Sequence, residues 1–261
     1  MFFQSACLGT LALAPSPSFS AEAKLAIVID DIGYSVARAQ RVIDLPGPIT
    51  LALLPYAPAS TEIAKRATRA GQEVILHQPM EPYPGPLVRE VRGTLMLAMR
   101  PLQFNRTLSA ALAAIPNVRG LNNHTGSLLT QHAEPMGRVM QQLKREGLYF
   151  LDSRTTPHTV AHQTAMTWSV PTIARDVFLD HIPNFELIDA QFARALKIAR
   201  RNGHAVLIGH PHRSSLDFLQ RRLRQLPADI SLVHVSELVR PRPVMLAQRE
   251  NPTSQRISLG Q

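Results

Sequence analysis

A chain of 261 residues is long enough for one large domain with a substantial buried core. Its 45% apolar and 18% charged residues are typical of a globular protein and exclude a disordered chain. The net charge of +9 comes mainly from arginines that are dispersed along the chain, without the helical stripe or aromatic interleaving of nucleic-acid-binding proteins, so no nucleic-acid partner is expected.

The first 21 residues differ in composition from the rest of the chain. They carry no charged side chain, and an apolar stretch from Ala6 to Ala14 is followed by prolines and small residues. This pattern, in residues 1–21, is typical of a secretory signal peptide and is too short for a membrane span. We therefore expect an exported, periplasmic protein that is not an integral membrane protein. Cys7 is the one cysteine, so the mature chain would hold no disulfide and no thiolate zinc site.

Strands and helices alternate through most of the chain. In chain order, the predicted elements are a strand at 25–29, a helix at 35–43, a strand at 49–53, a helix at 60–70 capped by Ser60, a strand at 74–76, a helix at 101–114, a strand at 118–121, a helix at 134–145, a strand at 148–151, short strands at 166–170 and 172–173, a helix at 185–202, a strand at 205–208, a helix at 214–226 and a strand at 230–233. Such alternation predicts a parallel sheet, and the number of strands favours an α/β barrel over an open sheet.

The domain boundaries follow from the same pattern. We expect the barrel domain to occupy residues 22–239. Residues 240–261 contain several prolines and arginines and little hydrophobic periodicity, which predicts a disordered tail.

Polar side chains follow five of the predicted strands, at the point where each strand ends. These segments are Asp30-Asp31, His77, Asn122-Asn123-His124, Asp152-Ser153-Arg154 and Gly209-His210-Pro211-His212. The carboxyl ends of parallel strands face one shared side of an α/β fold, where active sites form. Buried charges are costly unless they are paired or bind a metal, so we interpret this convergence as a functional site. Asp152 taken alone is equally compatible with capping the turn that follows it.

A carboxylate and two neutral imidazoles form a suitable ligand set for one divalent metal ion such as zinc, and they leave positions open for water and substrate. Asp30 and Asp31 are neighbours that leave the strand in different directions. One of them can therefore bind the metal while the other takes a proton from the attacking water.

These segments resemble the divergent polysaccharide deacetylases, a distant branch of the carbohydrate esterase 4 superfamily. The resemblance extends over about residues 24 to 238. It rests on the motifs Val28-Ile29-Asp30-Asp31-Ile32-Gly33, His77-Gln78-Pro79-Met80-Glu81-Pro82, Gly120-Leu121-Asn122-Asn123-His124-Thr125-Gly126-Ser127, Phe150-Leu151-Asp152-Ser153-Arg154-Thr155 and Ile208-Gly209-His210-Pro211-His212. It implies a distorted (β/α) barrel with seven strands, which uses a bound divalent metal to remove N- or O-acetyl groups from sugar polymers.

The resemblance also implies the metal ligands. In the superfamily's first motif, the second aspartate binds the metal, and Asp31 matches it. His124-Thr125 matches the start of the second motif, but Leu128 stands where that motif has its second histidine. We expect His77 to supply the missing imidazole, so the predicted ligands are Asp31, His77 and His124.

Three further residues receive catalytic roles from the resemblance. Asp30 matches the aspartate that acts as the general base, and His210 matches the histidine that acts as the general acid. Arg175, in the pair Arg175-Asp176, corresponds to the arginine that orients the base.

Two functions remain open at this point. The first is a metal-dependent hydrolase that deacetylates an envelope polysaccharide of the peptidoglycan type, with one divalent ion, expected to be zinc. The second is a non-catalytic periplasmic binding or scaffold domain that keeps the deacetylase fold, since Leu128 replaces a histidine and Trp168 is the one tryptophan available as a sugar platform. The presence of both Asp30 and His210 favours the enzyme, because a binding domain needs neither a base nor an acid.

Overall fold

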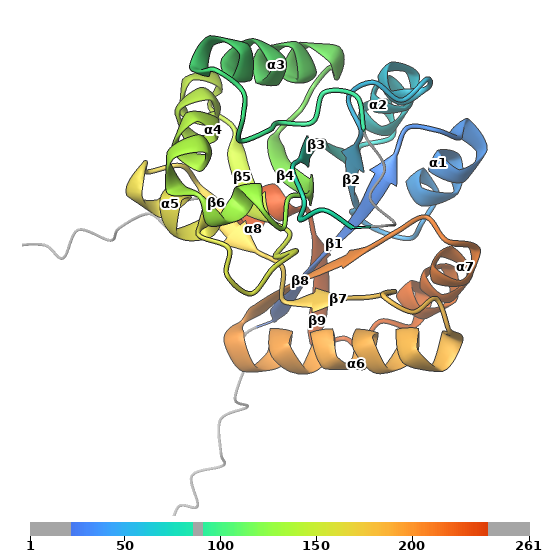
Figure 1. The fold of residues 1–261 in the computed structure, drawn as a ribbon. Coiled ribbons are helices and arrows are strands. Elements are labelled where there is room, and N and C mark those ends of the chain that lie inside the picture. Colours follow the sequence, from blue (N-terminus) through green and yellow to red (C-terminus); the bar gives the residue numbers. More distant parts are fainter. Residues whose placement is uncertain (1–21, 86–90, 240–261) are drawn as a thin grey trace, which may run out of the picture.

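The computed structural model describes residues 22–85 and 91–239 (Figure 1). The predicted signal peptide, 1–21, and the predicted tail, 240–261, lie outside the described residues. In chain order the elements are β1 (Ala23–Ile32), α1 (Val36–Ile43), β2 (Thr50–Leu53), α2 (Ser60–Arg69), β3 (Glu73–Met80), α3 (Pro101–Ala114), β4 (Gly120–Thr125), η1 (Leu129–Gln131), α4 (Ala133–Glu146), β5 (Tyr149–Asp152), α5 (Ala161–Thr167), β6 (Thr172–Ala174), β7 (Val177–Phe178), α6 (Phe185–Asn202), β8 (His204–Gly209), α7 (Arg213–Arg222), η2 (Leu223–Gln225), β9 (Ile230–Val233) and α8 (Val235–Val239).

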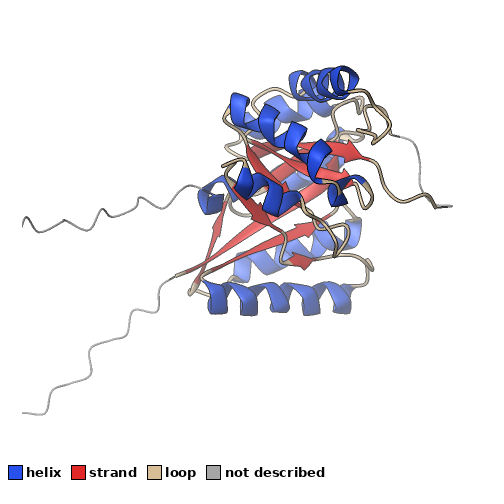
Figure 2. Cartoon of the chain, turned by 60° about the vertical axis from the view of Figure 1, so that its left-hand side comes forward, coloured by secondary structure: helices blue, strands red, loops and turns tan. Residues whose placement is uncertain are grey.

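The strands form one curled sheet in which the pairings between strands are parallel, as the alternation of elements predicts. The strand order is β6-β5-β4-β3-β2-β1-β8-β7, and β9 also pairs with β1. The longer helices cover the outer side of this sheet (Figure 2), whereas α8 packs with the residues inside the curl. The predicted α/β barrel architecture is therefore confirmed.

The predicted number of seven strands is wrong, because the sheet formed by the described residues has nine. One additional strand arises at the closure of the barrel, where the segment 172–178 pairs first with β5 as β6 and then with β8 as β7. The switch falls between two consecutive residues: the N–H of Arg175 donates to the carbonyl of Asp152 on β5, and the N–H of Asp176 donates to the carbonyl of Val206 on β8. The other additional strand is β9, which pairs with residues 23–26 of β1, on the N-terminal side of the β1 residues that pair with β2.

Three helix boundaries can be compared with the sequence signals beside them. Gly147 and Gly203 end α4 and α6 with φ angles of 67° and 81°, because glycine adopts this conformation without steric cost. Ser60 is not the cap of α2: it is the first helical residue, and its hydroxyl donates to the carbonyl of Leu54 instead.

The strand predicted at 166–170 is also wrong, because α5 covers Ala161–Thr167. The sequence 161–167 is short and mixed in character, so periodicity alone does not separate the two states.

Two hydrophobic clusters stabilise the barrel. The larger one lies between the helices and the outer side of the sheet. The smaller one fills the inside of the curl with alternate strand residues, such as Val28, Ile75, Leu151 and Ile208, and with residues of α8. Because side chains alternate between the two faces of a strand, this inner set also decides which polar residues point inward at the carboxyl ends. No helix among the described residues is long and apolar enough to span a membrane.

Candidate metal and catalytic site

The site lies at the carboxyl ends of the strands, on the inward-facing positions. Counted by twos from the inner apolar residues of β1, β3, β5 and β8, the next inward positions are Asp30, His77, Ser153 and His210. On β4 the corresponding inward positions are Asn122 and His124. The two-residue period of the strands therefore brings together side chains that lie far apart in the sequence.

Asp31 reaches the same site by a different route. It follows Asp30 directly, so a regular strand would point its side chain outward. The pairing of β1 with β2 shifts register between Ile29 and Ile32, and Asp31 has a φ angle of 57°. Aspartate tolerates this left-handed conformation better than most residues, and a register shift of this kind re-aims side chains. The irregularity allows two consecutive carboxylates to serve one site.

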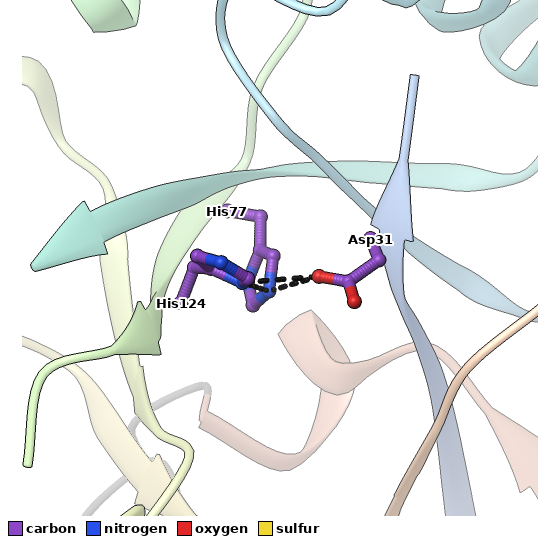
Figure 3. Close-up of side chains that lie close together, drawn as sticks. All are labelled: Asp31, His77 and His124. Atoms are coloured by element: carbon purple, nitrogen blue, oxygen red, sulfur yellow. Dashed lines mark hydrogen bonds and ion pairs between the residues drawn. The ribbon is translucent and has the colours of Figure 1, made fainter. Parts of the chain in front are cut away.

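Asp31, His77 and His124 form a compact triangle of possible ligand atoms (Figure 3). The Oδ1 atom of Asp31 lies 3.2 Å from Nε2 of His77 and 3.0 Å from Nδ1 of His124. The two imidazole nitrogens are 3.1 Å apart. Atoms bound to one ion at about 2.1 Å each lie roughly 3 to 3.5 Å from one another, so the spacing fits a single cation of this kind.

Two further observations show that these residues fit a cation. The Oδ1 atom of Asp31 is buried and has no hydrogen-bond partner among the described residues. Burial opposes its charge, but the neighbouring imidazoles of His124 and His77 outweigh burial and hold the pKa of Asp31 far below its usual value. Burial likewise opposes a charged His77, yet the carboxylates of Asp30 and Asp31 raise the pKa of its imidazole. The cluster thus favours positive charge at its centre.

A second group, formed by Asp180, His210 and His212, also has metal-ligand spacing. Asp180 is already saturated: its Oδ2 accepts from the N–H of His210 at 2.7 Å and from Ser215 at 2.6 Å, and its Oδ1 contacts Nδ1 of His210 at 2.9 Å. The orphaned oxygen of Asp31 therefore distinguishes the first group as the better metal site.

Asn122 connects the metal cluster to the predicted base. This fully buried amide accepts a hydrogen bond from Nδ1 of His77 at 2.8 Å and donates one to Oδ1 of Asp30 at 2.8 Å. A donor at Nδ1 leaves Nε2 of His77 as the atom that carries a free lone pair toward Asp31. Sequence analysis placed Asn122 among the polar residues at the strand ends but gave it no role, although its position two residues before His124 was a usable signal.

The predicted contact between Arg175 and the base is not formed. The guanidinium of Arg175 donates to the carbonyls of Ser153 at 2.7 Å and Arg154 at 2.9 Å. Its neighbour Asp176 accepts from the N–H of Val206, and the two side chains form no ion pair with each other among the described contacts. The hydrogen-bond partner of Asp30 is Asn122 instead, because Asn122 lies on the inner side of β4, directly beside it.

Asp30 itself is almost fully buried. Burial raises the pKa of its carboxyl above the usual value, and the nearby His77 and His210 only partly offset this effect. A carboxylate with a raised pKa is a stronger proton acceptor, which suits the role of a general base.

His210 faces the cluster from β8, with Nε2 lying 3.8 Å from Oδ2 of Asp31. Burial disfavours its charged form, but the hydrogen bond to Asp180 and the charges of Asp30 and Asp31 outweigh burial and raise the pKa of His210 to about 9. Sequence analysis did not identify Asp180, the partner of His210, because it lies in the irregular stretch after β7.

Asp152, which ends β5, caps local structure. Its carboxylate accepts from the N–H of Arg154 and His162 and from the hydroxyl of Thr159. These contacts assign it to shaping the loop before α5.

A cavity of about 1360 Å³ opens beside the Asp31–His77–His124 cluster, and Asp31, His124 and His210 line it.

A curled parallel sheet with a carboxylate, two imidazoles and a His–Asp pair at its carboxyl end defines a deacetylase-type barrel. The chain belongs to the divergent polysaccharide deacetylase family, whose model matches residues 27–239. It is 41% identical over 216 residues to the uncharacterized protein YibQ of Escherichia coli, a match that covers 83% of this chain and 67% of that protein.

Solved structures share this fold. An uncharacterized protein from Agrobacterium tumefaciens is 27% identical, with a TM-score of 0.80 over 85% of this chain and 91% of that chain. A family 4 carbohydrate esterase from Streptomyces lividans, in complex with acetate, is 12% identical, with a TM-score of 0.50 over 84% and 95% of the two chains. The second likeness concerns the fold alone.

Proposed function

We propose that this chain is a metal-dependent hydrolase that removes acetyl groups from a carbohydrate polymer of the cell envelope. The observation that carries the proposal is the convergence of the Asp31–His77–His124 cluster with a buried carboxylate, Asp30, and an imidazole, His210. The cluster lies beside one cavity, which Asp31, His124 and His210 line. Oδ2 of Asp30 lies 3.7 Å from Nε2 of His77, so the proposed base is adjacent to the proposed ligands.

Asp31, His77 and His124 would hold one divalent cation, for which we propose zinc. Such a cation, when bound, polarises the acyl carbonyl as a Lewis acid and lowers the pKa of the attacking water. The missing histidine at Leu128 does not remove a ligand, because His77 supplies an imidazole from β3.

The protein's own residues would move the protons. Asp30, held by Asn122, takes a proton from the attacking water, whose oxygen forms the new bond to the acyl carbon. His210 has Nδ1 occupied by Asp180, so Nε2 is the atom left to donate a proton. That proton goes to the sugar nitrogen or oxygen as its bond to the acyl carbon breaks, and acetate leaves.

The experiment compares metal content and acetate release in Asp30→Asn and Asp31→Asn. Asp31→Asn should weaken metal binding, because a neutral amide is a poorer ligand for a divalent cation. Asp30→Asn should keep the metal and lose about 10²–10⁴-fold in turnover, the contribution of a general base. Asp44→Asn, an exposed carboxylate at the end of α1, is the matched control and should change neither.

Elemental analysis of protein prepared without chelator and acetate release from chitin and peptidoglycan oligomers supply the two measurements. Absence of a stoichiometric metal in the wild type would refute the ligand assignment. A wild type that binds metal and releases no acetate from any substrate would support the alternative function, a non-catalytic binding domain of the envelope.

We also propose that the protein acts outside the cytoplasm, on the strength of the composition of residues 1–21. Mass spectrometry of protein isolated from cells should find these residues removed, and an intact Met1 would contradict export.

A further inference from the structure

The cavity beside the cluster is large and is lined by more than catalytic groups. Its volume of about 1360 Å³ exceeds the roughly 300–1,000 Å³ of typical small-molecule sites, so there is room for more than one sugar unit. Leu54, Val91, Met96 and Met99 form an apolar part of its wall. Such a surface packs against the carbon-bound hydrogens of a sugar ring or an acyl group.

The charged part of the wall has one predominant sign. Arg38, from α1, and Arg92, from the segment between β3 and α3, both line the cavity. Among the described residues of the lining, Asp31 is the one carboxylate, and it belongs to the proposed metal site. Clefts lined by one sign of charge concentrate ligands of the opposite sign.

Arg92 is held in place by its surroundings. Its guanidinium lies 4.8 Å from the centre of the Tyr56 ring. The next residue, Gly93, accepts a hydrogen bond from the buried amide of Gln78 at 2.9 Å, and a side chain at Gly93 would collide with Tyr56. Gln78 is the neighbour of His77 on β3, so the segment that carries Arg92 is attached to the strand that carries a proposed ligand.

Arg38 and Arg92 come from opposite sides of β2. Arg38 follows β1 and Arg92 follows β3, and these are the two neighbours of β2 in the sheet. Leu54, directly after β2, lies in the wall between them. Guanidinium groups match the geometry of carboxylates and phosphates and bind both with paired hydrogen bonds.

We propose that the cavity binds an acidic saccharide, in which a carboxylate or phosphate group is held by Arg38 and Arg92 while the acyl group faces Asp31 and His124. The position of the acyl group at Asp31 and His124 rests on the proposed function. The binding of the acidic group by Arg38 and Arg92 is independent of it and is tested without turnover.

The test measures dissociation constants by calorimetry for three oligosaccharides of equal length. One is a neutral N-acetylglucosamine oligomer, one carries a lactyl carboxylate on alternate sugars, and one carries phosphate groups. We expect at least one acidic oligomer to bind about tenfold or more tightly than the neutral one, as charge-assisted hydrogen bonds provide. The acidic oligomer that binds more tightly identifies which acidic group, carboxylate or phosphate, the protein recognises.

Arg38→Gln and Arg92→Gln should each remove most of this preference, and a urea-unfolding midpoint equal to that of the wild type should show that the fold is intact. Arg106→Gln is the matched control, because Arg106 is an exposed arginine of α3 outside the cavity lining. Equal affinities for the three oligomers, an equal loss in Arg106→Gln, or no binding of any oligomer would overturn the proposal.

The outcomes also separate this proposal from the proposed function. A preference for acidic oligomers without acetate release would refute the hydrolase and leave the acidic-saccharide site standing. Equal acetate release, in kcat/KM, from neutral and acidic oligomers would support the hydrolase and refute the acidic-saccharide site.

Discussion

At the scale of single residues, the site depends on hydrogen bonds that fix the orientation of chemically active groups. Asn122 holds both His77 and Asp30, and Asp180 holds His210. Both supporting residues are buried, so each lost hydrogen bond would leave an unpaired polar atom in the interior. The consequences can be measured separately for the proposed metal ligands, the proposed base and the proposed acid.

Asn122→Ala should affect both metal binding and stability. It leaves Nδ1 of His77 and Oδ1 of Asp30 without partners, which should cost about 1–3 kcal/mol in the free energy of unfolding. Losing the support of a ligating histidine should weaken metal affinity about 10–100-fold. Urea unfolding and metal titration measure the two effects.

Asn123→Ala is the neighbouring control. Its amide contacts Thr125, Thr155 and Ser153 but neither His77 nor Asp30, so it should lower stability without changing metal affinity. Equal metal affinity in Asn122→Ala and the wild type would show that His77 needs no support from Asn122.

The stability of the fold should also depend on pH through His210. In the metal-free protein, burial opposes the charged imidazole, but Asp180 and the carboxylates of the cluster outweigh it and raise the pKa of His210 to about 9, against about 6.5 in an unfolded chain. A raised pKa stabilises the fold while the group is protonated. This contribution is therefore fully present below about pH 6.5 and is lost as the pH rises through about 9.

Asp180→Asn should lower the pKa of His210 toward its ordinary value, since the neutral amide no longer favours the imidazolium. NMR of the histidine ring resonances between about pH 5 and about pH 10 measures the pKa of His210 directly. Asp176→Asn is the control, because its carboxylate accepts from Val206 and does not contact His210. An unchanged titration of His210 in Asp180→Asn would refute the assigned cause.

At the scale of secondary-structure elements, the amino ends of the strands are closed by a separate polar network. Glu73, at the start of β3, accepts from the hydroxyls of Thr50 on β2 and Tyr149 on β5 at 2.9 and 2.8 Å. It also accepts from the N–H of Ser236 in α8. One buried carboxylate thus connects three strands and the last helix, at the end of the barrel opposite the site.

Glu73→Ala should lower stability and leave the site intact. Three donors lose their common acceptor, which should cost about 2–4 kcal/mol in the free energy of unfolding. Metal content should equal that of the wild type, because the network lies at the other end of the strands. Glu73→Gln keeps an acceptor oxygen and should lose less. A drop in metal content larger than the unfolded fraction explains would contradict this separation.

At the scale of the whole molecule, the described elements run from the first strand, β1, to the last described helix, α8. Every described element and both hydrophobic clusters lie between Ala23 and Val239. A protein limited to residues 22–239 should therefore unfold with the same midpoint as the full chain and bind the same amount of metal. Parallel urea unfolding and elemental analysis test this, and a lower midpoint would show that residues outside 22–239 stabilise the barrel.

Much of the barrel and most of the site follow from local patterns in the chain. Buried apolar runs ending in polar residues predicted the parallel sheet and brought Asp30, His77, His124 and His210 to one edge, because strand periodicity and the shared direction of parallel strands are local properties. Whether these residues bind a metal and transfer protons stays a prediction.

Other features depended on contacts between distant segments. The left-handed Asp31 arises where β1 changes its pairing with β2, and the split of 172–178 into β6 and β7 arises from two different neighbours. Asn122 and Asp180 became functional candidates through the side chains beside them, and Arg175 was directed to backbone carbonyls. Hydrogen-bond partners of buried polar groups are chosen by what the closed barrel places within about 3 Å, and no periodicity along the chain encodes that choice.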